Sequence, residues 1–207
     1  MIKPDLKNAY SLGSPDDTKR LYADWAETYD SEFADQMDFV SPGIVAGAFA
    51  DSGGSGPVLD FGCGTGLVGE HLAQAAIGPV DGLDLSAEML GVAGRKGVYR
   101  DLIEGNILDG LVLPAGRYAG ITSSGTFTHG HVGPEAIDAL MRLAAPGALF
   151  ALSINAKHFH SLGFAAKFDA LAGQISGLEL PEVPLYGPNS TGPHKDDKGL
   201  VALLRKV

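Results

Sequence analysis

The stretch VLDFGCGTG, from Val58 to Gly66, constrains the fold of this chain more than any other feature. An apolar run of strand length leads directly into three glycines separated by single residues. Glycine adopts backbone conformations that other residues avoid, and it lets a ligand approach the main chain closely. The pattern predicts a strand that ends near Asp60, a tight turn and the start of a helix. Because open α/β sheets bind ligands at the carboxyl ends of their strands, we expect this turn to line a ligand site.

The rest of the chain alternates between apolar runs of strand length and runs with helical periodicity. Such alternation is typical of a parallel sheet with helices on both faces. The last two strand-like runs, LELPEVPLYG and LVALLRKV, are separated by a polar loop without a helix, which predicts an antiparallel hairpin. We therefore expect an α/β fold of three layers, with a Rossmann-like, seven-stranded, mostly parallel sheet and an antiparallel C-terminal hairpin.

The length of 207 residues favours a single domain. Within it we expect an N-terminal helical lid over residues 1–50, a ligand-binding core over 57–155, and a C-terminal helix and hairpin over 156–207. The chain has no apolar window of membrane-spanning length and no secretory pattern at its start, so we expect a cytoplasmic protein. Its one cysteine, Cys63, excludes an internal disulfide.

The net charge of −10 bears on the partners of the chain. An acidic surface repels polyanions, so we expect no nucleic-acid partner and no membrane, but a small-molecule substrate. The sequence leaves open whether the protein forms a homodimer.

The order of the glycines distinguishes between two classes of nucleotide cofactor. Dinucleotide-binding folds use G-x-G-x-x-G, whereas this chain has D-F-G-C-G-T-G. The string V-L-D-F-G-C-G-T-G resembles the first motif of the class I S-adenosylmethionine-dependent methyltransferases. That cofactor carries a sulfonium and an ammonium group but no phosphate, so the carboxylate of Asp60 is favourable beside it. The resemblance implies cofactor contacts at Asp60, Gly62, Cys63, Gly64 and Gly66.

Further positions continue the resemblance. Asp84 ends the next predicted strand, where the family places a carboxylate that binds the ribose hydroxyls. The following SAEML is similar to the family's D-x-S-x-x-M-L segment, which often flanks the adenine, although Ser86 is equally well explained as a helix cap. The remaining cofactor contacts that the resemblance implies are Leu85, Met89, Asn106, Ile107 and Ser123.

The N-terminal segment YADWAETYD resembles a W-A-x-x-Y-D signature found ahead of the core in many small-molecule members of the family. Tyr22 and Tyr29 are expected beside the cofactor and Trp25 beside the substrate, because aromatic faces attract a methylated cation. The alternative is a helix that only packs against the core.

Four of the six histidines form two pairs that follow the fourth and fifth predicted strands. We expect His129 or His131 to orient or deprotonate the methyl acceptor, and His158 and His160 to contact the substrate. The alternatives are polar loop residues without a catalytic role, or ligands of a divalent metal. No carboxylate is placed to complete such a site, so we predict none.

Together these features predict an enzyme that transfers a methyl group from S-adenosylmethionine to a small-molecule acceptor and forms S-adenosylhomocysteine. A second interpretation is a regulatory or scaffold protein that binds the cofactor without turnover. A third, an NAD-dependent oxidoreductase, conflicts with the glycine order.

Overall fold

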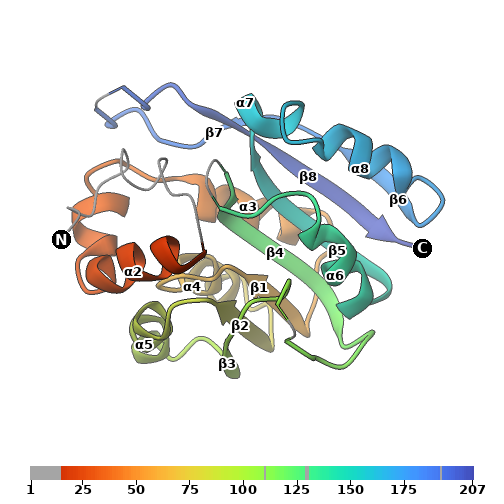
Figure 1. The fold of residues 1–207 in the computed structure, drawn as a ribbon, viewed down its shortest axis with the longest axis horizontal. Helices are drawn as coiled ribbons and strands as arrows, with labels where there is room; N and C mark the ends of the chain where they lie inside the picture. Colours follow the sequence, from red (N-terminus) through yellow and green to blue (C-terminus); the bar gives the residue numbers. More distant parts are fainter. Residues whose placement is uncertain (1–14, 110, 129–130, 192) are drawn as a thin grey trace.

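The computed structural model describes residues 15–109, 111–128, 131–191 and 193–207. One mixed sheet lies between two layers of helices (Figure 1). Within the described residues the sheet has eight strands, in the order β3-β2-β1-β4-β5-β8-β6, with β7 paired to β8. The strands are β1 (Val58–Phe61), β2 (Val80–Asp84), β3 (Asp101–Glu104), β4 (Tyr118–Phe127), β5 (Ala144–Asn155), β6 (Ile175–Glu179), β7 (Glu182–Pro184) and β8 (Lys198–Lys206).

The predicted fold class is confirmed, because β1 to β5 are parallel and β8 is antiparallel to β5 and β6. The structure has one strand more than predicted. The chain pairs with β8 twice, first through β6 and then through the three residues of β7. The run LELPEVPLYG is therefore an interrupted strand.

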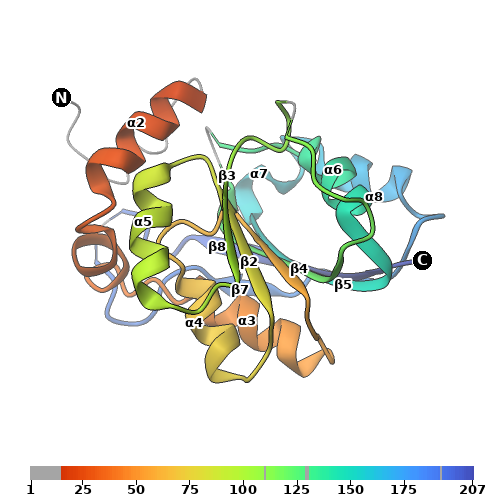
Figure 2. The same ribbon diagram turned by 90° about the horizontal axis from the view of Figure 1, so that it is seen from below.

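Figure 2 shows the sheet between its two helical layers. Helices α3, α4 and α5 cover one face, and α6, α7 and α8 cover the other. Apolar side chains fill both spaces: one cluster includes Phe49 and Leu72, the other Leu140 and Phe164. The helices are α3 (Ser41–Asp51), α4 (Leu67–Gln74), α5 (Ala87–Lys96), α6 (Ala136–Leu143), α7 (Ala156–Phe159) and α8 (Phe164–Ala170).

The C-terminal helix expected within residues 156–207 is replaced by two short helices, α7 and α8. Helix α8 begins after Gly163, which has a φ angle of 84°. This left-handed conformation suits glycine and separates α8 from α7. Among the described residues, none of the helices combines the length and the apolar character needed to span a bilayer.

Residues 15–39 form the lid segment, which comprises α2 (Pro15–Trp25) and the π-helix η1 (Tyr29–Ala34). Helix α2 lies beside α5 in both views (Figures 1 and 2). An aromatic cluster holds the segment together, with Trp25 and Phe33 at 5.2 Å between ring centroids. The cluster also contains Tyr186 from the connection between β7 and β8, so the lid segment packs on the C-terminal part of the chain.

An ionic cluster links the starts of β2, β3 and β4. The buried Asp81 carboxylate accepts two hydrogen bonds from Arg100, at 2.8 and 2.7 Å, and one each from Arg117 and Tyr118. Burial by itself would raise the pKa of Asp81, but these hydrogen bonds and the charges of the two arginines outweigh it and lower that pKa. The cluster lies at the opposite edge of the sheet from the glycine turn.

Candidate functional site

The glycine loop, residues 62–66, joins β1 to α4. Gly62, Gly64 and Gly66 have φ angles of 67°, 53° and 94°, which side-chain-bearing residues rarely adopt. Their surroundings differ. A Cβ on Gly62 would lie 2.0 Å from Thr126 Oγ1, and one on Gly66 would lie 2.9 Å from Tyr99 Cε2. A Cβ on Gly64 would meet no described atom within 4 Å. Only Gly64 thus faces open space, while Gly62 and Gly66 allow close packing within the protein.

That open space belongs to a cavity of about 380 Å³ at the carboxyl ends of β1, β2 and β3. The chain changes direction here, since β2 lies on one side of β1 and β4 on the other, and such a switch point is the usual ligand site of an open α/β sheet. Its walls come from residues 62–65, 83–86, 105–108, 124–126 and 131–132, and from Thr18, Lys19, Tyr22, Tyr29, Phe39, Pro42, Phe61, Leu67, Val68 and Met89.

Asp84 supplies a carboxylate on the wall of the cavity. Its Oδ2 accepts from the Gly64 N–H at 2.8 Å, and its Oδ1 accepts from the Ser86 N–H at 3.0 Å. Burial raises the pKa of Asp84, and these backbone donors oppose that shift. The two bonds fix the carboxylate against the glycine loop and leave further acceptor capacity for a ligand.

Asp60 does not line the cavity. Its buried carboxylate accepts from Tyr99 Oη at 2.7 Å and from Thr122 Oγ1 at 3.3 Å. Burial raises the pKa of Asp60 to about 7. Asp60 therefore lies in the sheet behind the glycine loop and bonds to Tyr99 and Thr122. The sequence interpretation had placed it against a cationic cofactor.

Three glycines make room for the Tyr99 ring that reaches Asp60. A Cβ added to Gly66, Gly69 or Gly82 would lie 2.9, 2.4 or 3.1 Å from an atom of that ring. The conformation and the lack of a side chain at Gly66 thus serve contact between α4 and Tyr99.

The cofactor residues expected after β2 and β3 do line the cavity, namely Leu85, Met89, Asn106 and Ile107. Met89 and Ile107 are buried and form an apolar surface. Asn106 Oδ1 already accepts from the Leu108 N–H at 2.9 Å, so this oxygen shapes the turn. The buried Cys63 also lines the cavity, and burial raises the pKa of its thiol, which keeps it protonated.

Ser123 was expected beside the cofactor but is not on the cavity wall. Its hydroxyl is buried and donates to the Phe61 carbonyl at 2.7 Å. The neighbouring Ser124 lines the cavity instead, because successive residues of a strand face opposite sides.

The lid segment contributes Tyr22 and Tyr29 to the wall. Trp25 is 3% exposed and lies behind them, with its ring centroid 6.1 Å from that of Tyr22 and 5.2 Å from that of Tyr29. The structure thus gives Trp25 a packing position and does not bring it to the cavity.

Of the histidines, His131 reaches the cavity. Its Nε2 lies 3.0 Å from Tyr22 Oη, within hydrogen-bonding distance. His129 lies outside the described residues. His158 and His160, in and just after α7, do not line the cavity. In the described part of the chain, histidine, cysteine and carboxylate side chains form no cluster that would hold a metal ion.

Sequence reasoning missed several wall residues, among them Lys19, Phe39 and Thr126. Lys19 donates to Glu104 Oε1 at 2.7 Å, which links α2 to the end of β3. Thr126 is found only through its contacts with the end of β1 and the glycine loop, where Oγ1 lies within hydrogen-bonding distance of the Phe61 carbonyl, at 3.2 Å, and of the Gly62 carbonyl, at 3.5 Å. A local motif carries no signal for such contacts between distant segments.

Comparison with known proteins identifies the core. Residues 58–147 match a family described as methyltransferase domain. This core is a methyltransferase domain. Solved structures with a similar fold include S-adenosylmethionine-dependent methyltransferases.

One relative of this methyltransferase domain matches only a short part of the chain. RID2 of Arabidopsis thaliana, an 18S rRNA (guanine-N(7))-methyltransferase, is 44% identical over 66 residues, which are 32% of this chain and 22% of that protein. The match therefore covers less than a quarter of the relative.

Two solved structures are similar over most of the chain. The complex of DhpI with S-adenosylhomocysteine has a TM-score of 0.65 at 19% identity and covers 90% of this chain and 94% of its own. A TehB-like SAM-dependent methyltransferase from Corynebacterium glutamicum has a TM-score of 0.61 at 18% identity, with 90% and 98% covered. At these identities the likeness shows the fold.

Proposed function

We propose that this chain transfers a methyl group from S-adenosylmethionine to a small-molecule acceptor held in the cavity. One observation carries the proposal. The open face of Gly64, the carboxylate of Asp84 and the aromatic rings of the lid segment surround the same space. When bound, S-adenosylmethionine supplies the electrophilic methyl group. The protein has to align the acceptor and exclude water, which by themselves give large rate gains.

The cavity fits this cofactor in chemistry as well as in place. Asp84 would accept hydrogen bonds from the ribose hydroxyls, and the apolar surface of Met89 and Ile107 would cover the adenine. The space in front of Gly64 would take the amino-acid end. Asp60 has no direct contact in this proposal, because its carboxylate is already bonded to Tyr99.

The acceptor would lie between the lid segment and the end of β4. Tyr22, Tyr29 and Phe39 bring aromatic rings to this part of the wall, and His131 brings a titratable group. We propose that His131 takes the proton of the acceptor, and that the hydroxyl of Tyr22 orients the imidazole.

A small acceptor is favoured over a nucleic acid by two features. The lid segment forms part of the cavity wall, and the net charge of −10 repels a polyanion. The rRNA substrate in the name of RID2 belongs to a protein of which the match covers 22%. The proposal includes one domain over residues 1–207 and a cytoplasmic location, as the sequence predicts.

Calorimetric titration with S-adenosylmethionine, S-adenosylhomocysteine and NAD tests the cofactor site. The wild type should bind the first two ligands, and Gly64→Val should lose both, because its side chain would fill the open space. Binding of NAD alone, or of no ligand, would contradict the proposal.

An acceptor screen then tests the role of His131. His131→Ala should lower kcat by about 100-fold, the scale of general-base catalysis, and remove the acidic limb of the pH profile. His160→Ala is the matched control and should leave both unchanged, since this histidine is outside the cavity. An unchanged pH profile in His131→Ala would remove His131 from the mechanism. Cofactor binding without turnover across the panel would favour the regulatory interpretation.

A further inference from the structure

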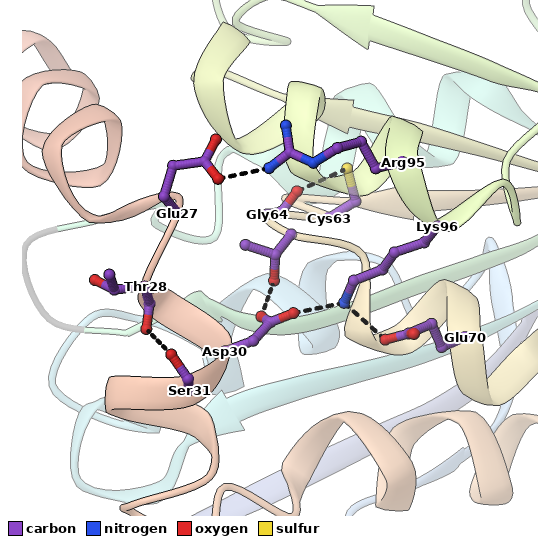
Figure 3. Close-up of polar contacts among 10 residues, drawn as sticks. Glu27, Thr28, Asp30, Ser31, Cys63, Gly64, Glu70, Arg95 and Lys96 are labelled. Carbon is purple, nitrogen blue, oxygen red and sulfur yellow. Dashed lines mark hydrogen bonds and ion pairs between the residues drawn. The ribbon is translucent and has the colours of Figure 1, made fainter.

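The lid segment meets the glycine loop at one acidic side chain, Asp30 of η1. Asp30 Oδ1 accepts from Thr65 Oγ1 at 2.5 Å, and its Oδ2 accepts from Lys96 Nζ at 2.7 Å. Lys96 also donates to Glu70 Oε2 at 2.7 Å. Figure 3 shows the Asp30 carboxylate between the glycine loop and Lys96 in the last turn of α5. One carboxylate thus joins the lid segment, the glycine loop and α5.

Burial makes these contacts stronger than ordinary surface ion pairs. Thr65 is 1% exposed, and the Lys96 side chain is 15% exposed. Exposed pairs contribute little because water and salt screen them, whereas hydrogen bonds to a charged group in a partly buried place are stronger. With the lid segment in this position, removal of the Asp30 acceptor would leave the buried Thr65 hydroxyl without this bond, which is unfavourable.

The same network continues to the ligand cavity. Thr65 follows Gly64, whose N–H donates to Asp84 at 2.8 Å. On the other side, Asp30 follows Tyr29, whose ring lines the cavity. The position of Asp30 therefore determines how Tyr29 and the glycine loop lie relative to each other.

We propose that Asp30 is a positioning residue that couples closure of the lid segment to binding of the cofactor. It acts through Thr65 and Lys96, and it does not touch the ligand itself. The inference rests on the proposed function, because it takes the cavity as the S-adenosylmethionine site.

A neighbouring ion pair provides a matched control. Glu27 of the lid segment accepts from Arg95 Nη2 at 2.7 Å, so it also joins the segment to α5 (Figure 3). Its side chain is 76% exposed and that of Arg95 is 59% exposed. Among the described residues, neither side chain bonds to the glycine loop. Glu27→Gln thus removes the same charge from the same segment without affecting Thr65.

The experiment measures S-adenosylhomocysteine binding by calorimetry and by the fluorescence of Trp25, the one tryptophan of the sequence. Asp30→Asn and Thr65→Val should each weaken binding about tenfold, which corresponds to about 1.4 kcal/mol. Glu27→Gln should stay within about twofold of the wild type. The double variant Asp30→Asn/Thr65→Val should lose less affinity than the sum of the two single losses, because both substitutions remove the same contact.

The fluorescence separates positioning from a loss of stability. Ligand addition should change the Trp25 signal in the wild type and in Glu27→Gln, and this change should be reduced in Asp30→Asn at unchanged melting temperature. If Asp30→Asn does not fold, Thr65→Val carries the test, since valine has nearly the shape of threonine. Wild-type affinity and fluorescence response in both variants would overturn the inference alone. Absence of binding to the wild type would overturn the proposed function and the inference together.

Discussion

The hydrogen-bonded pair of Asp60 and Tyr99 leads to a quantitative prediction about stability and pH. Asp60 has no exposed surface, and burial raises its pKa from 3.8 to about 7, while the hydrogen bonds from Tyr99 and Thr122 oppose that rise. In the unfolded chain the carboxyl ionises near its ordinary value. Between these two pKa values the folded protein holds a proton that the unfolded chain has released.

The sign of the effect follows from this difference. Since the folded state binds the extra proton, the free energy of unfolding falls as the pH rises through the window between 3.8 and about 7. The slope for one proton is about 1.4 kcal/mol per pH unit. From pH 5 to pH 8 the contribution of Asp60 should decrease by about 2 to 3 kcal/mol, most of it below pH 7.

Urea denaturation at pH 5, 6, 7 and 8 tests this for the wild type, Asp60→Asn and Tyr99→Phe. The asparagine amide stands in for the protonated acid and does not titrate. The stability of Asp60→Asn relative to the wild type should therefore increase by about 2 to 3 kcal/mol from pH 5 to pH 8. Tyr99→Phe removes a donor to the carboxylate, so the decline should continue to higher pH. The same pH dependence in the wild type and in Asp60→Asn would refute the reasoning.

Two further predictions concern packing and the ionic cluster. Gly69→Ala should lower the free energy of unfolding by about 1 to 3 kcal/mol, because its Cβ would lie 2.4 Å from Tyr99 Cζ. Gly91→Ala is the control within a helix. Its Cβ would meet no described atom within 4 Å, so this variant should raise the free energy of unfolding by about 0.5 to 1 kcal/mol. Equal effects of the two variants in urea denaturation would contradict the packing argument. Asp81→Asn should cost about 2 kcal/mol at pH 7 through loss of the charge that faces Arg100. Because the pKa of Asp81 is lowered, the difference in unfolding free energy between the wild type and Asp81→Asn should shrink as the pH falls through that pKa. A difference that persists in acid would contradict this role of the Asp81 charge.

The sequence predicted the parts of the site that depend on local pattern. The glycine loop, Asp84 at the end of β2, and the apolar side chains of Leu85 and Met89 all lie where expected. Each follows from the position of a residue at the end of a strand or in the first turn of the next helix. Parallel strands end at a common edge, so these positions converge without knowledge of the remaining chain.

The lid segment was predictable only in part. The motif located Tyr22 and Tyr29, but it did not separate them from Trp25, which faces the aromatic cluster. The direction of each ring depends on how α2 and η1 pack against Tyr186, far away in the sequence. The helical and strand periodicity of the sequence does not predict this packing either.

By itself, then, the amino-acid sequence determined the α/β class, the strand that leads into the glycine loop and the residues at its carboxyl edge, because these follow from local periodicity and from glycine's conformational freedom. Only the tertiary structure decided which groups meet. It directed Asp60 to Tyr99 and away from the cavity, placed His131 beside Tyr22, and set Asp30 against Thr65. Each of these pairs joins segments distant in sequence, and such contacts depend on the packing of whole elements.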